Sequence, residues 1–217
     1  MHLSVLYDLL MRLPLLVWVS FCALRQFAGL LQYTNVTTMD FISAVHVTMR
    51  LTTITFMLLL AGLVALRSRP SAKASGLEPR ISALAGSFLM YGVVLFPRPE
   101  LSLSLEMVST TLILVGTAGA ALTLYQLGRS FSIMAESRHL VISGPYRFVR
   151  HPLYLTEEIA IFGMFMQFAS AWPAIVLAVQ LAFQLRRIHN EEAVLTANFP
   201  EYAAYQQNTA RLLPGIY

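Results

Sequence analysis

Six long apolar runs, separated by short polar loops, constrain the fold of this chain more than any other feature. A membrane-spanning helix needs about 20 predominantly apolar residues, whereas an ordinary soluble domain has about 25% charged residues. Here 57% of the 217 residues are hydrophobic and only 12% are charged. The sequence therefore predicts an all-α fold, a polytopic membrane helix bundle with about six passes. The expected spans are Leu10 to Gln32, Val47 to Leu66, Ile81 to Phe96, Leu103 to Leu127, Leu155 to Ala169 and Trp172 to Leu185.

Two of these runs carry further information about packing. The last two are short for full spans, so we expect them to form a hairpin that turns at Trp172-Pro173. The fourth run contains small residues that allow neighbouring helices to approach closely. These residues are Gly116, Gly119, Ala120 and Ala121.

The basic residues predict the orientation of the bundle. Cytoplasmic loops of membrane proteins are enriched in lysine and arginine. The loop between the second and third runs contains Arg67, Arg69, Lys73 and Arg80, and arginines also follow the fourth and sixth runs. Six passes place nearly all of these residues on one side. We therefore expect a multi-pass integral membrane protein in contact with membrane lipids, with both termini and the C-terminal helices in the cytoplasm. No cleavable signal peptide is expected.

Several classes of site are excluded by residue counts and placement. The single cysteine, Cys22, rules out an internal disulfide and any cysteine-based metal site. The five histidines are too few for a membrane di-iron centre, so no metal is expected although His189 and Glu192 are one helical turn apart. The basic residues form neither a tail nor a stripe with interleaved aromatics, so nucleic-acid binding is not expected. The oligomeric state is not predicted.

Polar residues persist in a first block that runs from Gly128 to Tyr154, directly before an apolar run. Gly144-Pro145 predicts a turn, and Pro152 predicts the start of a helix. Glu157 and Glu158 follow within the apolar run. Acids in a first helical turn complement the helix dipole, but acids within the membrane are costly and usually functional. Both interpretations stay open for these two residues.

A second polar block, Arg186 to Leu195, follows the sixth run. If this block is helical, Arg187 and Glu191 are four residues apart and can pair across one turn. Glu192 then faces another direction, the side of Leu195, Phe199 and Tyr202. Pro200 predicts a fresh helical turn with Glu201 near its start. The alternative is an amphipathic cytoplasmic helix whose charges are simply solvated.

In this order, and on either side of a short apolar hairpin, these blocks resemble the isoprenylcysteine carboxyl methyltransferase family, which is also similar to phospholipid methyltransferases. The resembling part runs from about Leu127 to Pro214. The motifs are Leu-Val-x-x-Gly-Pro-Tyr-Arg-x-x-Arg-His-Pro-x-Tyr at Leu140 to Tyr154 and Glu-Glu-x-x-Leu at Glu191 to Leu195. A tail pattern of Phe199, Tyr202, Tyr205, Arg211 and Pro214 completes the resemblance.

The resemblance implies S-adenosylmethionine as the cofactor, bound without a soluble Rossmann domain. It also implies two parts of the chain: N-terminal transmembrane helices over residues 1–127 that shape a substrate cavity, and a cofactor-binding and catalytic part over residues 128–217. Arg187 and Glu192 are the implied catalytic residues. The implied cofactor-binding residues are Leu140, Val141, Gly144, Tyr146, His151, Pro152, Tyr154 and Glu157. The family's usual small residue after the Pro-x-Tyr-x pattern is replaced here by Thr156.

The residue types suit methyl transfer to a lipophilic acceptor. A carboxylate is already ionised near neutral pH and needs no general base, but an arginine fork such as Arg187 can fix its plane. The expected substrate is therefore the carboxylate of a prenylcysteine-like or other lipophilic molecule that enters from the bilayer. Methylation of a phospholipid amine would instead require Glu192 or His151 to accept a proton. Two further alternatives are an NADPH-dependent membrane reductase and a non-enzymatic lipid-binding or transport protein.

Overall fold

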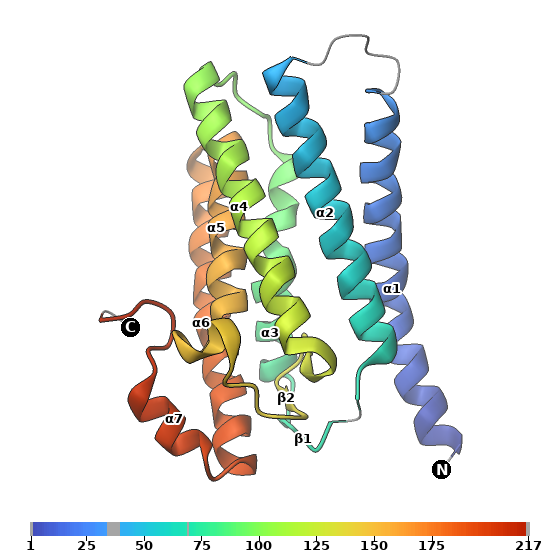
Figure 1. The fold of residues 1–217 in the computed structure, drawn as a ribbon, viewed down its shortest axis with the longest axis vertical. Helices are drawn as coiled ribbons and strands as arrows, with labels where there is room; N and C mark the ends of the chain where they lie inside the picture. Colours follow the sequence, from blue (N-terminus) through green and yellow to red (C-terminus); the bar gives the residue numbers. More distant parts are fainter. Residues whose placement is uncertain (1, 34–39, 69, 216–217) are drawn as a thin grey trace.

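The computed structural model describes residues 2–33, 40–68 and 70–215, and within these ranges the chain folds as an all-α bundle (Figure 1). Arg69 and the loop residues 34–39 lie outside the described residues. The helices of the bundle are α1 (His2–Leu31), α2 (Phe41–Leu66), α3 (Glu78–Phe88), α4 (Leu103–Leu127), α5 (Pro152–Gln167) and α6 (Ala171–Asn198). Each overlaps one of the six predicted runs, which confirms the prediction of an all-α helical bundle.

Three segments of these helices are long and apolar enough to cross a membrane by themselves: Arg12–Leu31, Phe41–Leu66 and Leu103–Ser130. The third predicted run has a different local structure, because α3 continues as a 3-10 helix, η1 (Leu89–Leu95). Side chains close two helix ends. Asp40 accepts a hydrogen bond from the amide of Ser43 at the start of α2, and Arg12 donates to the carbonyls of Val64 and Ala65 at its end.

Helix α6 is longer than the predicted run, because it continues without a break through the second polar block to Asn198. Its last third therefore extends beyond the apolar part of the bundle. The short helix α7 (Tyr202–Asn208) follows Pro200, as the sequence predicts. In Figure 1, α7 lies at the same end of the bundle as the start of α1 and the loop that connects α2 to α3.

The connections at this end contain the only two strands among the described residues, β1 (Ala72–Lys73) and β2 (Glu136–Ser137). They pair in antiparallel fashion, with Ala72 opposite Ser137 and Lys73 opposite Glu136. The side chain of Asn198 donates to the hydroxyl oxygens of Ser71 and Ser137, at 3.0 and 2.8 Å. The loop after α4 is thereby attached to both the basic loop and the end of α6. Two 3-10 turns, η2 (Gly128–Ser130) and η3 (Gly144–Arg147), complete this loop.

The small residues of α4 allow α5 to pack directly against it, as predicted. A Cβ added to Gly116 would lie 2.4 Å from the amide nitrogen of Ala160, and one added to Gly163 would lie 2.8 Å from the carbonyl oxygen of Ser109. The hydroxyl of Ser109 in turn donates to the carbonyl of Gly163 at 2.8 Å. This close contact of backbones fixes α5, which carries part of the first polar block, against the long helix α4.

We predict that Gly116→Ala lowers stability by about 1–3 kcal/mol, because the added methyl group must push two helix backbones apart. Gly62→Ala in α2 is the matched control, since its added Cβ would have no neighbour within 4 Å. The measurement is thermal unfolding of both purified variants in detergent. Equal unfolding temperatures for the two variants would contradict close packing of α4 on α5.

Candidate functional site

A cavity opens beside the end of α6, between the loop that follows α4, the start of α5, and α7. It contains about 660 Å³ of empty space, including its open mouth. Its walls are Leu127, Ser130, Ser132, Glu136, Arg138, His139, Leu140, Val141, Tyr146, Arg150, His151, Leu153, Tyr154, Glu191, Leu195, Tyr202 and Tyr205. Both polar blocks and the tail pattern therefore meet around one space.

Five of the eight residues that the resemblance implies for the cofactor line this cavity: Leu140, Val141, Tyr146, His151 and Tyr154. The other three lie beside it. Gly144 adopts a positive φ of 60° in the turn of η3, against the side chain of Gln126. Pro152 is buried at the first position of α5, where its missing N–H costs nothing. Glu157 lies one turn further along α5 than the cavity-lining Tyr154 and contacts α6.

The cavity also contains two carboxylates that were not among the predicted site residues. Glu191 extends from α6, and its carboxylate accepts a hydrogen bond from the hydroxyl of Tyr154. Glu136 lies near the opposite wall, where it accepts from the hydroxyl of Ser132 at 2.9 Å and from Arg138 at 2.7 Å. Burial would raise the pKa of Glu136, but the charge of Arg138 outweighs this effect and lowers it. The Glu-Glu-x-x-Leu motif is the sequence feature that could have identified Glu191 as a site residue.

Glu192, the adjacent residue, is not among the residues that line the cavity and instead holds three basic side chains together. Its Oε1 accepts from Arg150 Nε at 2.8 Å and lies 3.1 Å from His151 Nε2, while its Oε2 pairs with Arg211 Nη2 at 2.7 Å. Only 5% of the side chain is exposed. The charge of Glu192 acts on the hydroxyl of Tyr202, in line with the side of the helix that the sequence predicts for it, whereas Glu191 is the acid in the cavity wall.

The electrostatic environment of Glu192 strongly favours its ionised form. Burial alone would raise the pKa of this carboxyl, but hydrogen bonds from His151 and Arg150 outweigh burial and lower the pKa to about 2. A general base works best when its pKa lies near the operating pH. Glu192 is thus a permanent anion at neutral pH, suited to holding cations in place and unsuited to accepting a proton.

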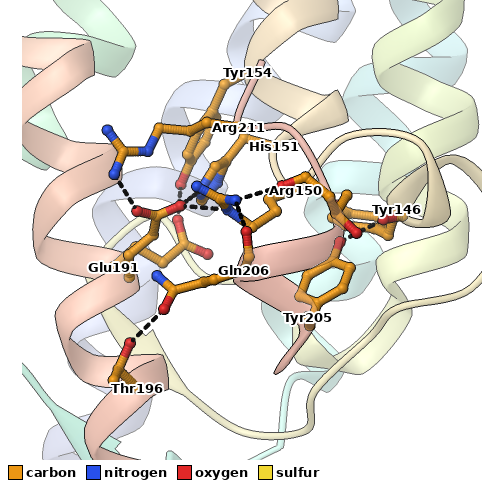
Figure 2. A network of polar contacts seen from close by, with 11 residues as sticks. Tyr146, Arg150, His151, Tyr154, Glu191, Thr196, Tyr205, Gln206 and Arg211 are labelled. Carbon is orange, nitrogen blue, oxygen red and sulfur yellow. Dashed lines mark hydrogen bonds and ion pairs between the residues drawn. The ribbon is translucent and has the colours of Figure 1, made fainter. Parts of the chain in front are cut away.

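The same network attaches the tail of the chain to the start of α5. Arg150 donates from Nη1 to the carbonyl oxygens of Gln206 and Thr209, and the amides of Arg150 and His151 donate to the carbonyls of Ala210 and Arg211. The hydroxyl of Tyr205 donates to the carbonyl of Tyr146 (Figure 2). These bonds hold α7 over the cavity. Burial raises the pKa of Tyr205 to about 12, so its hydroxyl stays protonated as a donor.

Arg187 is buried within the bundle and is not among the residues that line the cavity. Its guanidinium carbon is 4.4 Å from the centroid of the Tyr154 ring, and its side chain is only 3% exposed. The expected ion pair with Glu191 is not the one observed. Arg187 Nη1 instead lies 3.9 Å from Glu157 Oε2. Because α5 begins at Pro152, neither Glu157 nor Glu158 lies in its first turn, where an acid would complement the helix dipole.

We predict that Glu192 stabilises the fold in a pH-dependent way. Because folding lowers its pKa from 4.5 to about 2, this stabilisation is complete above about pH 4.5 and is lost as the pH falls towards 2. Glu192→Gln should remove that dependence and cost about 3–5 kcal/mol at neutral pH, since it leaves buried arginines without their anion. Thermal unfolding between pH 3 and 7 provides the measurement.

Glu106→Gln is the matched control for this substitution, because Glu106 pairs with Arg98 at the surface and its side chain is 38% exposed. Exposed ion pairs contribute at most about 1 kcal/mol. A loss for Glu192→Gln no larger than for Glu106→Gln would show that the network does not support the fold.

Two curated proteins are similar in sequence to about half of this chain. The chain is 32% identical over 114 residues to the nickel-cobalt-cadmium resistance protein NccN of Alcaligenes xylosoxydans xylosoxydans, which covers 50% of this chain and 53% of that protein. It is 35% identical over 117 residues to the cobalt-zinc-cadmium resistance protein CzcN of Cupriavidus metallidurans, covering 54% of this chain and 50% of that protein. The chain thus spans about half the length of these curated relatives.

The matching protein family is described by a reaction, whereas the names of these two relatives describe metal resistance. Residues 108–197 match the family model, and this segment includes both polar motifs and most of the cavity walls. The part of the chain that forms the candidate site thus matches the Isoprenylcysteine carboxyl methyltransferase (ICMT) family, which confirms the resemblance predicted from the motifs.

Proposed function

We propose that this protein is an S-adenosylmethionine-dependent methyltransferase of the membrane that methylates the carboxylate of a lipophilic, prenylcysteine-like acceptor. The observation that carries the proposal is a stripe along one face of α6. Residues 180, 184, 187, 191 and 195 are three or four positions apart and so share that face. The stripe runs from inside the bundle, past Arg187, to Glu191 and Leu195 in the cavity wall.

The residues of the cavity fit the proposed cofactor. S-adenosylmethionine combines a sulfonium cation, an ammonium and carboxylate pair, and an adenosine with free hydroxyls. Glu191 offers an anion for a cationic group, and Glu136 offers an acceptor for hydroxyl donors. The hydroxyl of Tyr202, which is buried and has no hydrogen-bond partner, offers a donor. When bound, this cofactor supplies a methyl group on a sulfonium that an oxygen nucleophile can displace.

Arg187 is suited to hold the acceptor. One helical turn of α6 separates it from Glu191, a rise of about 6 Å along the helix axis. Its guanidinium, which lies over the ring of the cavity-lining Tyr154, can therefore position a carboxylate next to a cofactor in the cavity. The Arg187 side chain is only 3% exposed, and a water-poor site favours the combination of an anion with a cation.

The proton chemistry of the site also favours a carboxylate over an amine. Transfer to a carboxylate oxygen releases no proton, whereas a protonated amine must lose one before or during attack. Glu192, the residue implied for catalysis, has a pKa of about 2 and is a poor base. In our proposal Glu192 therefore acts as a positioning residue, because it fixes Arg150, His151 and the tail that covers the cavity.

We predict that S-adenosylhomocysteine, the demethylated cofactor, raises the unfolding temperature of the purified protein in detergent. Any ligand that binds only the folded state stabilises it, by about 2.7 kcal/mol at 100 times its Kd. Glu191→Gln should weaken this effect, because it removes the anion in the cavity. The measurement is a ligand titration monitored by thermal unfolding. A response to NADPH with none to S-adenosylhomocysteine would support the reductase alternative and contradict our proposal.

We also predict that Arg187→Lys slows methyl transfer to a prenylcysteine carboxylate by about 100-fold, because lysine retains the charge but loses the fork that orients the acceptor. Affinity for S-adenosylhomocysteine should stay unchanged, since Arg187 lies outside the cavity walls. Arg186→Lys is the control, because Arg186 is exposed and pairs with Glu78. Equal rates for the two lysine variants would contradict the role assigned to Arg187.

A further inference from the structure

Glu157 stands between Arg187 and the outside of the bundle. Of its side chain 26% is exposed, against 3% for Arg187. The carboxylate approaches the guanidinium only to 3.9 Å, which is longer than a hydrogen bond. Glu157 is therefore a counter-ion that is not hydrogen-bonded to Arg187, and it lies outside the cavity walls.

The groups around Arg187 include buried hydrogen-bond donors without a partner. Arg187 Nε and Gln184 Nε2 are buried and have no hydrogen-bond partner. The Oε1 of Gln184 is used by Arg187 Nη1 at 3.5 Å. Buried donors without partners are rare in folded proteins because each costs about 1–3 kcal/mol. A second acceptor group at this place would satisfy them, and a carboxylate has the matching chemistry.

We propose that Glu157 is a specificity-determining residue that occupies one side of Arg187 until an acceptor carboxylate displaces it. This inference rests on the proposed function, since it concerns the acceptor of the same reaction. One guanidinium cannot neutralise two carboxylates, and like charges repel strongly where water is scarce. An anionic acceptor must therefore push Glu157 outward, towards the side where it is already partly exposed. An uncharged acceptor analogue does not meet this repulsion.

The neighbouring acid provides a matched comparison. Glu158 is adjacent in sequence and also lies within α5, but its Oε1 accepts a hydrogen bond from Gln180 Nε2 at 2.8 Å. The same nitrogen of Gln180 donates to the carbonyl of Gly86 at 2.9 Å, which ties this acid to α3 and α6. Removing the charge of Glu158 therefore changes the same region without removing the carboxylate that pairs with Arg187.

The experiment measures binding of an S-farnesyl-N-acetylcysteine carboxylate and of its uncharged carboxamide, in the presence of S-adenosylhomocysteine. The full chain is used in detergent, as wild type, Glu157→Gln and Glu158→Gln. We expect Glu157→Gln to lower the Kd of the carboxylate by about tenfold or more, the effect of about 1.4 kcal/mol of repulsion. The Kd of the carboxamide should not change, and Glu158→Gln should change neither. Unchanged affinity for S-adenosylhomocysteine shows that each variant is folded.

If Glu157→Gln does not fold, Glu157→Met provides an apolar side chain of similar size with the same expected tightening. An unchanged or higher Kd for the carboxylate in the Glu157 variants overturns the inference and leaves the proposed function in place. No binding of either S-farnesyl ligand by wild type and by the Glu157 variants overturns the acceptor class and the inference together. No binding of S-adenosylhomocysteine by wild type overturns the proposed function itself.

Discussion

The ion network around Glu192 is the interaction on which the geometry of the site depends. One buried carboxylate on α6 binds Arg150 and His151 before α5 and Arg211 in the tail. These four residues come from three segments that are distant in sequence. Apart from two backbone hydrogen bonds between residues 150–151 and 210–211, their side chains connect these segments. Without the carboxylate, two arginines would face each other in a space that excludes water. The cavity walls are therefore positioned by charge as well as by apolar packing.

A second constraint follows from the continuity of α6. Because this helix passes from the apolar bundle into the polar end without a break, it fixes the distance between Arg187 and Glu191 independently of any loop. Tyr154 contributes to both sides, since its ring faces Arg187 and its hydroxyl binds Glu191. A rigid helix and one shared aromatic residue thus connect a cavity at the bundle's end with a polar group inside the bundle. Methyl transfer between a polar cofactor and a lipophilic acceptor requires such a connection.

The sequence predicted the positions of the helices because apolar runs of membrane length leave few other folds. It also predicted the tight packing of Gly116 and the motifs that surround the cavity. It could not decide between Glu191 and Glu192, because adjacent helical residues differ by about 100° in direction and the facing of α6 depends on its neighbours. The partner of Arg187 was missed for a similar reason. Spacing within one helix suggested Glu191, whereas tertiary packing brought Glu157 from another helix closer.

The two charge clusters of the site differ in how completely they are satisfied, and this difference indicates what each one does. Around Glu192, cations and carbonyls are matched at hydrogen-bond distances, which is the condition for a rigid buried network. Around Arg187, a long contact to Glu157 accompanies two donors without partners. A protein gains nothing in stability from leaving such donors unmet. In our proposal the cluster around Arg187 therefore accommodates a ligand group, and the cluster around Glu192 is the frame that holds it in place.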